Sequence, residues 1–214
     1  MGKYSPYAFM SDAETAEIRR CLCREEKIYN KGDIIMRFTE KAQELALLEK
    51  GLAYLVCTDV NGQKSILDYY EVGDVFGKRF LPESDRNIYY IQAKEPCTIS
   101  TIDYDRLLSR CENNCGKHLI LLNNLLDSAM RKSQIHIVIL SRRSTQDKLM
   151  TFFMYLRDQS DSDKFTLPLS LSDLADYLAV DRSAMMREIK KLNESGAIRS
   201  DGNVIRIKKD EYGL

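Results

Sequence analysis

Residues 169–192 read LSLSDLADYLAVDRSAMMREIKKL, and this stretch decides the fold of the second half of the chain. Ser170 or Ser172 can cap a first helix and Asp181 a second one, because their side-chain oxygens accept hydrogen bonds from the free N–H groups of a helix start. Apolar residues recur at helical spacing in both parts, so each helix has one face to bury. The pattern predicts two short helices with a sharp turn between them.

This arrangement is typical of a helix-turn-helix, whose second helix enters the major groove of DNA. An ordinary helical hairpin with a solvated charged face also fits residues 169–192. The residues that follow favour DNA binding. Ser195-Gly196 ends the second helix, and residues 197–207 predict a small basic hairpin around Asp201-Gly202, which would form a wing beside it.

Charge and composition restrict the classes of function. The 32 Lys and Arg residues balance the 32 Asp and Glu residues, but residues 181–209 carry eight basic against four acidic side chains, so the attraction to phosphate is local. We expect no signal peptide and no membrane span, since no apolar run approaches about 20 residues. Six cysteines are too sparse for a disulfide scaffold, which predicts a cytoplasmic protein with reduced thiols.

The first half of the chain is rich in strands after a helical start. Ser11 can cap a helix that runs to about Cys23 within a helical lead-in over residues 1–27. Strands are predicted over residues 53–58 and 64–70, on either side of Asn61-Gly62, and over residues 87–93 and 97–102. Short strands at this spacing favour a jelly-roll β-barrel. The fold class is therefore α+β.

A long helix is predicted from about residue 116 to residue 141. A heptad seam runs along it and consists of Leu119, Leu122, Leu126, Ala129, Ser133, His136 and Leu140. A second apolar stripe (Leu121, Leu125, Ile135, Ile139) lies alongside, so the helix needs two partners: its own barrel and the same helix of a second subunit. The alternative is one wide core face within a monomer.

Three parts follow from these patterns. They are a barrel domain over residues 1–115, a dimerisation helix over residues 116–141 and a winged helix-turn-helix over residues 142–214. Ser144 or Thr145 caps the first helix of the last part. Residues 158–164 are expected to form a polar loop.

This order of parts resembles the Crp/Fnr family, the cyclic-AMP receptor and fumarate–nitrate regulators of bacteria, over nearly the whole chain. The likeness rests on the order and spacing of several short stretches. They are Lys31-Gly32-Asp33, Glu49-Lys50-Gly51, residues 72–77, residues 92–97, Leu174-Ala175, residues 180–183, Arg187, Leu192 and Gly196.

The resemblance implies a homodimeric transcription regulator that binds pseudo-palindromic double-stranded DNA, with RNA polymerase as a further partner. Arg182 and Arg187 match the recognition-helix arginines of the family, and a guanidinium fork fits guanine O6 and N7. Ser170, Ser172 and Lys190 suit phosphate contacts. Ser183 stands where many members carry a glutamate that reads cytosine, so the half-site of the family does not carry over.

The same likeness argues against cyclic AMP as the effector. At the positions of the ribose-binding glutamate and the phosphate-binding Arg-Ser pair, this sequence has Lys78, Asn87 and Ile88. Arg86 could replace the lost arginine only by a register shift, which would turn its side chain to the other face of the strand. An unidentified small-molecule effector would instead contact residues of the same region, namely Phe76, Lys78, Arg79, Asn87 and Tyr89. The alternative is that the two cations are solvated in a loop and the aromatic residues belong to the core.

Redox sensing and enzymatic activity are the remaining alternatives. The chain lacks the N-terminal cysteine cluster of the iron–sulfur regulators, and no metal or cofactor is expected from Cys21, Cys23, Cys111 and Cys115. His118 is expected to be an exposed helix residue. A cupin enzyme needs several histidines in its barrel, and residues 28–102 contain none. The sequence therefore predicts a DNA-binding regulator controlled by a small-molecule or redox signal, or one that acts without an effector.

Overall fold

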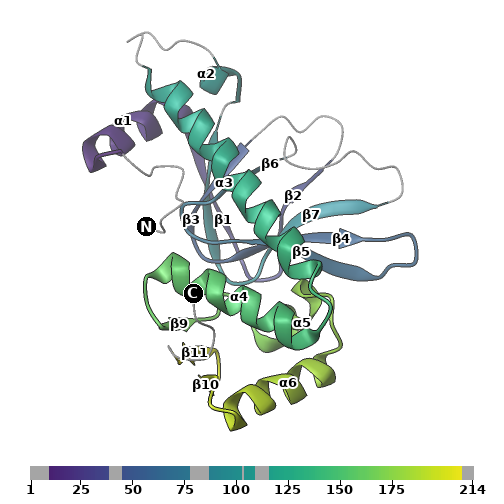
Figure 1. Ribbon diagram of the computed structural model, residues 1–214. Coiled ribbons are helices and arrows are strands. Elements are labelled where there is room, and N and C mark those ends of the chain that lie inside the picture. Colours follow the sequence, from purple (N-terminus) through teal and green to yellow (C-terminus); the bar gives the residue numbers. More distant parts are fainter. Residues whose placement is uncertain (1–9, 39–44, 78–86, 103, 109–115, 209–214) are drawn as a thin grey trace. The chain divides into compact units, whose positions relative to one another are not determined.

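The computed structural model describes residues 10–38, 45–77, 87–102, 104–108 and 116–208. The chain forms two compact units, one built mainly from residues 3–130 and the other from residues 131–214. The division falls within the long helix α3 (Lys117–Leu140), which Figure 1 shows as one continuous helix. The predicted boundaries at residues 116 and 142 flank this helix.

Two antiparallel four-stranded sheets make up most of the first unit. The strands are β1 (Cys23–Tyr29), β2 (Ile34–Arg37), β3 (Leu45–Lys50), β4 (Ala53–Thr58), β5 (Lys64–Tyr70), β6 (Val75–Gly77), β7 (Ile88–Ala93) and β8 (Cys97–Ile102). One sheet has the order β1-β8-β3-β6 and the other the order β2-β7-β4-β5. The predicted α+β fold is confirmed, and the described strands form two sheets in place of one closed barrel.

A core between the sheets draws residues from both of them. It includes Leu48 and Ile99 from one sheet and Leu55 and Ile91 from the other. Gly51, in the turn before β4, lies close to this core with φ +96°. A Cβ there would lie 2.4 Å from Pro96 O, so no other residue fits without a shift of the backbone.

A second core lies on the other face of the β3 sheet. The helices α1 (Asp12–Leu22), α2 (Tyr104–Leu108) and α3 cover it and bury Ile18, Leu22, Leu121 and Leu125. Strand β3 serves both cores because successive side chains point to opposite faces of a sheet. Its residues 45–48 are therefore all buried.

The helical lead-in is correct in part. Ser11 caps α1, and a full capping box joins Ser11 to Glu14, as the sequence predicts. The lead-in does not extend to residue 27, because α1 ends at Leu22 and β1 begins at Cys23 and pairs with β8. Strand β1 is an edge strand of its sheet, and its charged sequence CREEKIY lacks the alternation of apolar residues that would predict a strand.

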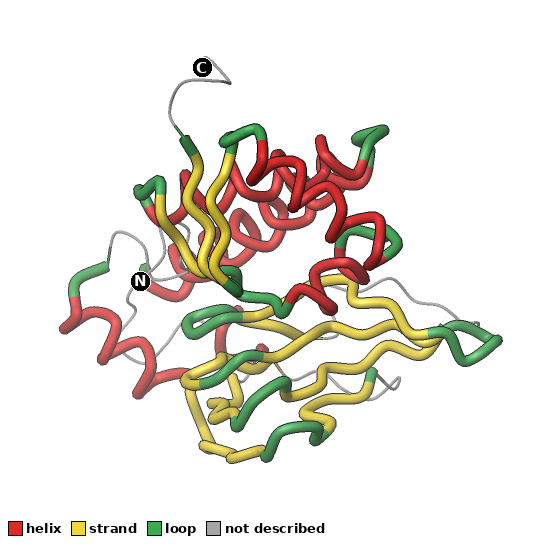
Figure 2. Tube along the Cα trace, turned by 90° about the horizontal axis from the view of Figure 1, so that it is seen from below, coloured by secondary structure: helices red, strands yellow, loops and turns green. Residues whose placement is uncertain are grey.

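The second unit combines helices with a small sheet. Helix α4 (Thr145–Ser160), capped by Ser144, is followed by β9 (Lys164–Thr166), α5 (Leu171–Tyr177), α6 (Arg182–Glu194), β10 (Ile198–Asp201) and β11 (Val204–Ile207). The strands lie in the order β10-β11-β9 (Figure 2). The expected polar loop over residues 158–164 is wrong at both ends, because α4 continues to Ser160 and the unpredicted strand β9 begins at Lys164. The predicted hairpin is confirmed, with Gly202 at φ +55° in its turn.

Candidate nucleic-acid interface

The two helices of residues 169–192 begin where their caps predict. Ser170, and not Ser172, caps α5 by accepting a hydrogen bond from Asp173 N. Asp181 caps α6 and accepts from Ala184 N at 2.8 Å. The hydroxyl of Ser170 also donates to the Asp173 carboxylate, so it is engaged within the helix start. Ser172 is exposed and has no side-chain hydrogen bond to another described residue.

The turn between α5 and α6 is tight and contains no glycine. Ala179 has φ +51°, a left-handed conformation that costs a residue with a Cβ roughly 1–2 kcal/mol. Lys148 of α4 donates to Leu178 O at 3.0 Å, just before this residue. Because the neighbouring carbonyl is held by another helix, tertiary contacts keep the turn in its strained form.

His136 holds the same end of α5 from the last turns of α3. Its Nε2–H donates to Tyr177 O at 2.9 Å. The two rings stack with centroids 4.0 Å apart and planes 7° apart. Tyr177 is buried in the core of the second unit, next to Phe152. The end of α3 is therefore packed directly against the first helix of the helix-turn-helix.

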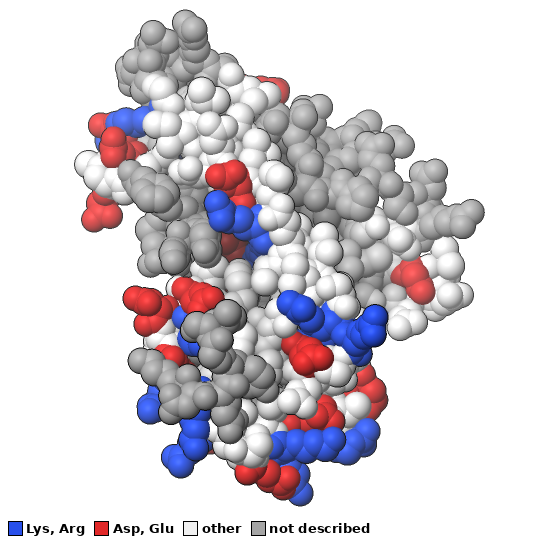
Figure 3. Space-filling view, in the orientation of Figure 1, with Lys and Arg blue, Asp and Glu red and all other residues white. Residues whose placement is uncertain are grey.

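Helix α6 buries apolar residues on one face and exposes its basic residues on the other. Met185, Ile189 and Leu192 are buried in the second unit. The opposite face exposes Arg182, Ser183, Met186, Arg187, Lys190 and Lys191. Figure 3 shows Lys and Arg side chains, with a few acidic ones, over α6 at the lower edge. This is the face that the sequence predicts for DNA.

Arg182 and Arg187 differ from the two lysines of α6 in their partners. Lys191 pairs with Glu188 at 2.8 Å, and Lys190 lies 3.7 Å from Glu194. Neither arginine forms an ion pair with any described residue. Their guanidinium groups can therefore bind an external acceptor without first breaking an internal contact.

The predicted basic hairpin supplies two cations of a row on the wing, and the sequence prediction missed the third, Lys164 of β9. The register places Arg199 of β10 opposite Arg206 of β11, and Arg206 opposite Lys164 of β9. All three side chains are exposed, and none forms an ion pair within the described chain. We call these three residues the wing row; in Figure 3 basic side chains gather over this part of the sheet, at the lower left. Like charges directly opposite destabilise a sheet, so the row suits a bound polyanion.

Helix α3 has two apolar faces, and only one is covered. Leu121, Leu125 and Ile139 are buried. The exposed face follows a seven-residue pattern that we call the α3 outer row, and it consists of Leu119, Asn123, Leu126, Met130, Ser133, Ile137 and Leu140. Ile137 is 66% exposed and Leu119 63% exposed, which is unusual for large apolar side chains.

The predicted seam is correct at every second residue and wrong at the residues between them. Four predicted residues (Leu119, Leu126, Ser133, Leu140) lie in the α3 outer row. Leu122 instead packs against the second core, His136 packs on Tyr177, and Ala129 is half-buried. Steps of three and four residues both fit a helical stripe, so the sequence could not decide between Leu122 and Asn123 or between His136 and Ile137.

The residues predicted for an effector do not form one described site. Lys78 and Arg79 lie outside the described residues. Phe76 is 1% exposed in the core between the sheets and contacts Tyr70 at 5.0 Å between ring centroids. Asn87 Nδ2 donates to Tyr89 Oη at 3.5 Å, and Tyr89 packs partly against the same core. Binding of an effector here stays a prediction.

The histidine and cysteine positions differ from expectation in one respect. His118 is buried and 5% exposed, so the prediction of an exposed helix residue is wrong. Cys111 and Cys115 lie outside the described residues. Among the residues that are described, no group of three or more His, Cys, Asp or Glu side chains could hold a metal ion. No helix in this part of the chain is both long and apolar enough to span a bilayer.

Two families match the two parts of the chain. Residues 26–114 match the cyclic nucleotide-binding domain, and residues 147–211 match the Crp-like helix-turn-helix domain. The probable transcriptional regulator flp of Lacticaseibacillus casei is 26% identical over 185 residues, which cover 85% of this chain and 82% of that protein. The cAMP-activated global transcriptional regulator CRP of Pasteurella multocida is 26% identical over 190 residues, or 86% and 90% of the two chains.

Solved structures agree in fold. FixK2 from Bradyrhizobium japonicum superposes with a TM-score of 0.66 at 20% identity, over 86% of this chain and 92% of that one. A CooA mutant from Carboxydothermus hydrogenoformans gives a TM-score of 0.71 at 18% identity, over 90% and 86%. With a cyclic nucleotide-binding domain followed by a Crp-like helix-turn-helix, the chain belongs to the Crp/Fnr family of DNA-binding transcription regulators.

Proposed function

We propose that this protein regulates transcription as a homodimer bound to a pseudo-palindromic DNA site. The observation that carries the proposal is the exposed face of α6, where Arg182 and Arg187 have no ion pair with a described residue. Arg182 and Ser183 stand at the N-terminal end of the helix, which reaches base edges when such a helix enters the major groove. The wing row adds phosphate contacts beside it.

A second copy of the chain is the proposed partner of the α3 outer row. The row repeats every seven residues, as the seams of paired parallel helices do. Large apolar residues such as Met130 and Ile137 are exposed along it. Two copies joined here would present two α6 helices, and a two-fold symmetric reader requires a two-fold symmetric site.

We further propose that the N-terminal domain responds to a signal other than cyclic AMP. At the described positions where the family binds the cyclic phosphate, Asn87 is neutral and Ile88 is apolar and 61% exposed. A phosphate needs charged or multiple hydrogen-bond donors at its site. In a titration calorimetry experiment with the full chain, cyclic AMP should produce no saturable heat. Saturable binding at micromolar concentration would overturn this part of the proposal.

The DNA proposal is tested by selection of sites from a random duplex library with the full-length protein, followed by fluorescence anisotropy. Selected sequences should be inverted repeats whose half-sites lie about one helical turn apart. A single half-site would support DNA binding but contradict the dimer. If no sequence is enriched, in the presence or absence of cell-extract metabolites, the assignment of α6 as the reading helix is wrong.

Regulation without an effector is the second candidate. The half-buried Tyr89 and the buried Phe76 support it, since both pack on the core between the sheets. Under this reading, the affinity for the selected site stays constant when metabolite extracts or reductants are added. A change of tenfold or about 1.4 kcal/mol would favour a signal at the N-terminal unit. RNA polymerase as a partner stays a prediction.

A further inference from the structure

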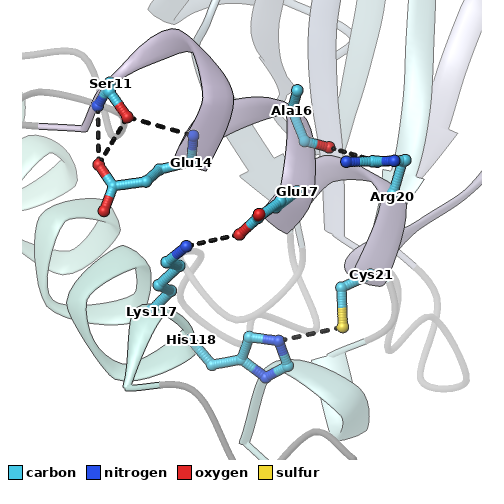
Figure 4. A network of polar contacts seen from close by, with 8 residues as sticks. All are labelled: Ser11, Glu14, Ala16, Glu17, Arg20, Cys21, Lys117 and His118. Carbon is cyan, nitrogen blue, oxygen red and sulfur yellow. Dashed lines mark hydrogen bonds and ion pairs between the residues drawn. The ribbon is translucent and has the colours of Figure 1, made fainter. Parts of the chain in front are cut away.

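Cys21 and His118 are in contact although 97 residues separate them in the sequence. Cys21 Sγ lies 3.2 Å from His118 Nε2 (Figure 4). Cys21 is in the last turn of α1, and His118 is in the first turn of α3. The proposed DNA interface uses neither residue, so the contact requires its own explanation.

The surroundings fix this contact. On α1, Ile18 and Leu22 are buried in the second core, on either side of Cys21 in sequence. Beside the pair, Lys117 Nζ donates to the Glu17 carboxylate at 2.6 Å and joins the same two helices (Figure 4). His118 is 5% exposed, whereas Cys21 is only half-buried. Cys21 is therefore partly accessible to solvent, whereas His118 is enclosed.

A ring nitrogen at this distance changes what a thiol can do. The thiolate is the nucleophile, and a base within hydrogen-bond reach can accept the thiol proton. The other described cysteines have no histidine in contact. Burial raises the pKa of the Cys23, Cys57 and Cys97 thiols, with further increases from Glu49, Asp59 and Glu95, respectively. These shifts favour the protonated thiol at all three positions.

We propose that Cys21 and His118 form a thiol–imidazole pair that reacts with peroxides. The thiol proton moves to His118 Nε2, and the sulfur attacks one oxygen of the peroxide. The S–O bond forms as the O–O bond breaks, and the departing oxygen takes the proton from the imidazolium. With hydrogen peroxide the products are one water molecule and a sulfenic acid, so the sulfur loses two electrons and the peroxide gains them.

Oxidation at this position has a structural consequence. The modified sulfur lies 3.2 Å from the ring of His118, so oxidation changes the contact between α1 and α3. Oxidation of Cys21 on α1 would therefore affect the first turn of α3, the helix that carries the α3 outer row. This is a modification site that does not depend on the identity of the DNA site.

The test uses full-length protein with less than one equivalent of hydrogen peroxide, dimedone to trap sulfenic acid, and peptide mass spectrometry with fragmentation. Cys21 should be labelled before Cys23, Cys57 and Cys97. His118→Gln should slow the labelling of Cys21 by about tenfold or more, since it removes the base. Lys117→Gln is the matched control, because it removes the neighbouring ion pair and keeps His118.

The two variants separate base catalysis from simple access. If the exposure of the thiol alone sets the rate, both substitutions loosen α1 and Cys21 is labelled faster in both variants. Under the proposal, His118→Gln slows the reaction and Lys117→Gln does not. If His118→Gln fails to fold, the order of labelling in the wild-type protein decides. Equal rates at Cys21 and Cys57 in the wild type, or an undiminished rate in a folded His118→Gln protein, would overturn the proposal.

Discussion

Two exposed helix faces differ in chemistry: the α3 outer row is mainly apolar, and the outer face of α6 is mainly basic. Ile137 and Leu119 are exposed apolar side chains. Their transfer from water to another apolar surface is favourable by about 25 cal/mol for each Å² buried. Exposed Arg182 and Arg187 are well solvated and gain only when an anion replaces water. A partner on the first face would therefore add stability, whereas a partner on the second would serve binding. Substitutions on the two faces should have correspondingly different effects.

Ile137→Glu should have the largest effect. A carboxylate in a buried seam is desolvated without a partner, so dimerisation should weaken by about 3 kcal/mol, roughly a hundredfold in the dissociation constant. Light scattering after size-exclusion chromatography measures the mass. Val60→Glu is the control, because Val60 is 75% exposed in the β4–β5 turn and should leave the dimer intact. An unchanged dimer mass in Ile137→Glu would contradict the role of the outer row.

Arg187→Ala tests the basic face. Loss of a bidentate contact to guanine should weaken binding to the selected site by about 1–3 kcal/mol, or about tenfold to a hundredfold. Fluorescence anisotropy gives the affinity, and thermal unfolding should be unchanged because the side chain is exposed. Arg20→Ala, an exposed arginine of α1, is the matched control. If both variants bind as tightly as the wild type, α6 does not read DNA through Arg187.

Arg206→Gln tests the wing row with two readouts of opposite sign. Removal of a phosphate contact should weaken binding by the same factor on every sequence and lower the salt dependence by about one released counterion. The free protein should gain a few tenths of a kcal/mol, up to about 0.5, because Arg206 lies between two other cations. Lys31→Gln, an exposed cation of the first unit, should change neither the salt slope nor the stability. Sequence-selective loss in Arg206→Gln would assign it to base contact instead.

Ala179→Gly should have the smallest effect. It tests whether the turn between α5 and α6 is strained. Glycine accepts φ +51° without strain, and after the greater freedom of the unfolded chain is subtracted the gain should be about 0.5 kcal/mol. Ala16→Gly, within the right-handed helix α1, should instead cost up to about 1 kcal/mol. Thermal unfolding distinguishes the signs. A destabilised Ala179→Gly protein would show that the turn does not store strain.

Helix starts and tight hairpins were predictable because their causes lie within a few residues. Ser11, Ser144 and Asp181 each cap the helix that follows them, through a hydrogen bond to a backbone N–H three residues on. The β4–β5 hairpin turns at Gly62, which has φ +79°. The separation of apolar from basic residues on α6 was equally readable, because one helical period defines both faces.

Strands and contacts that depend on distant residues were not predictable. Residues 45–48 form a strand buried on both faces, and such a run lacks the alternation that indicates a strand. The wing row needs the pairing of Arg206 with both Arg199 and Lys164, and strand β9 was not predicted. The turn at Ala179 contains no glycine to indicate it.

The sequence by itself determined the order of parts, the start of α6 and the residues that α6 exposes. Only the tertiary structure decided which stripe of α3 remains uncovered and where the two histidines lie. The physical reason is the range of the interactions. Caps and helical faces arise within one or two turns, whereas the contacts of His136 with Tyr177 and of His118 with Cys21 exist only after distant helices pack together.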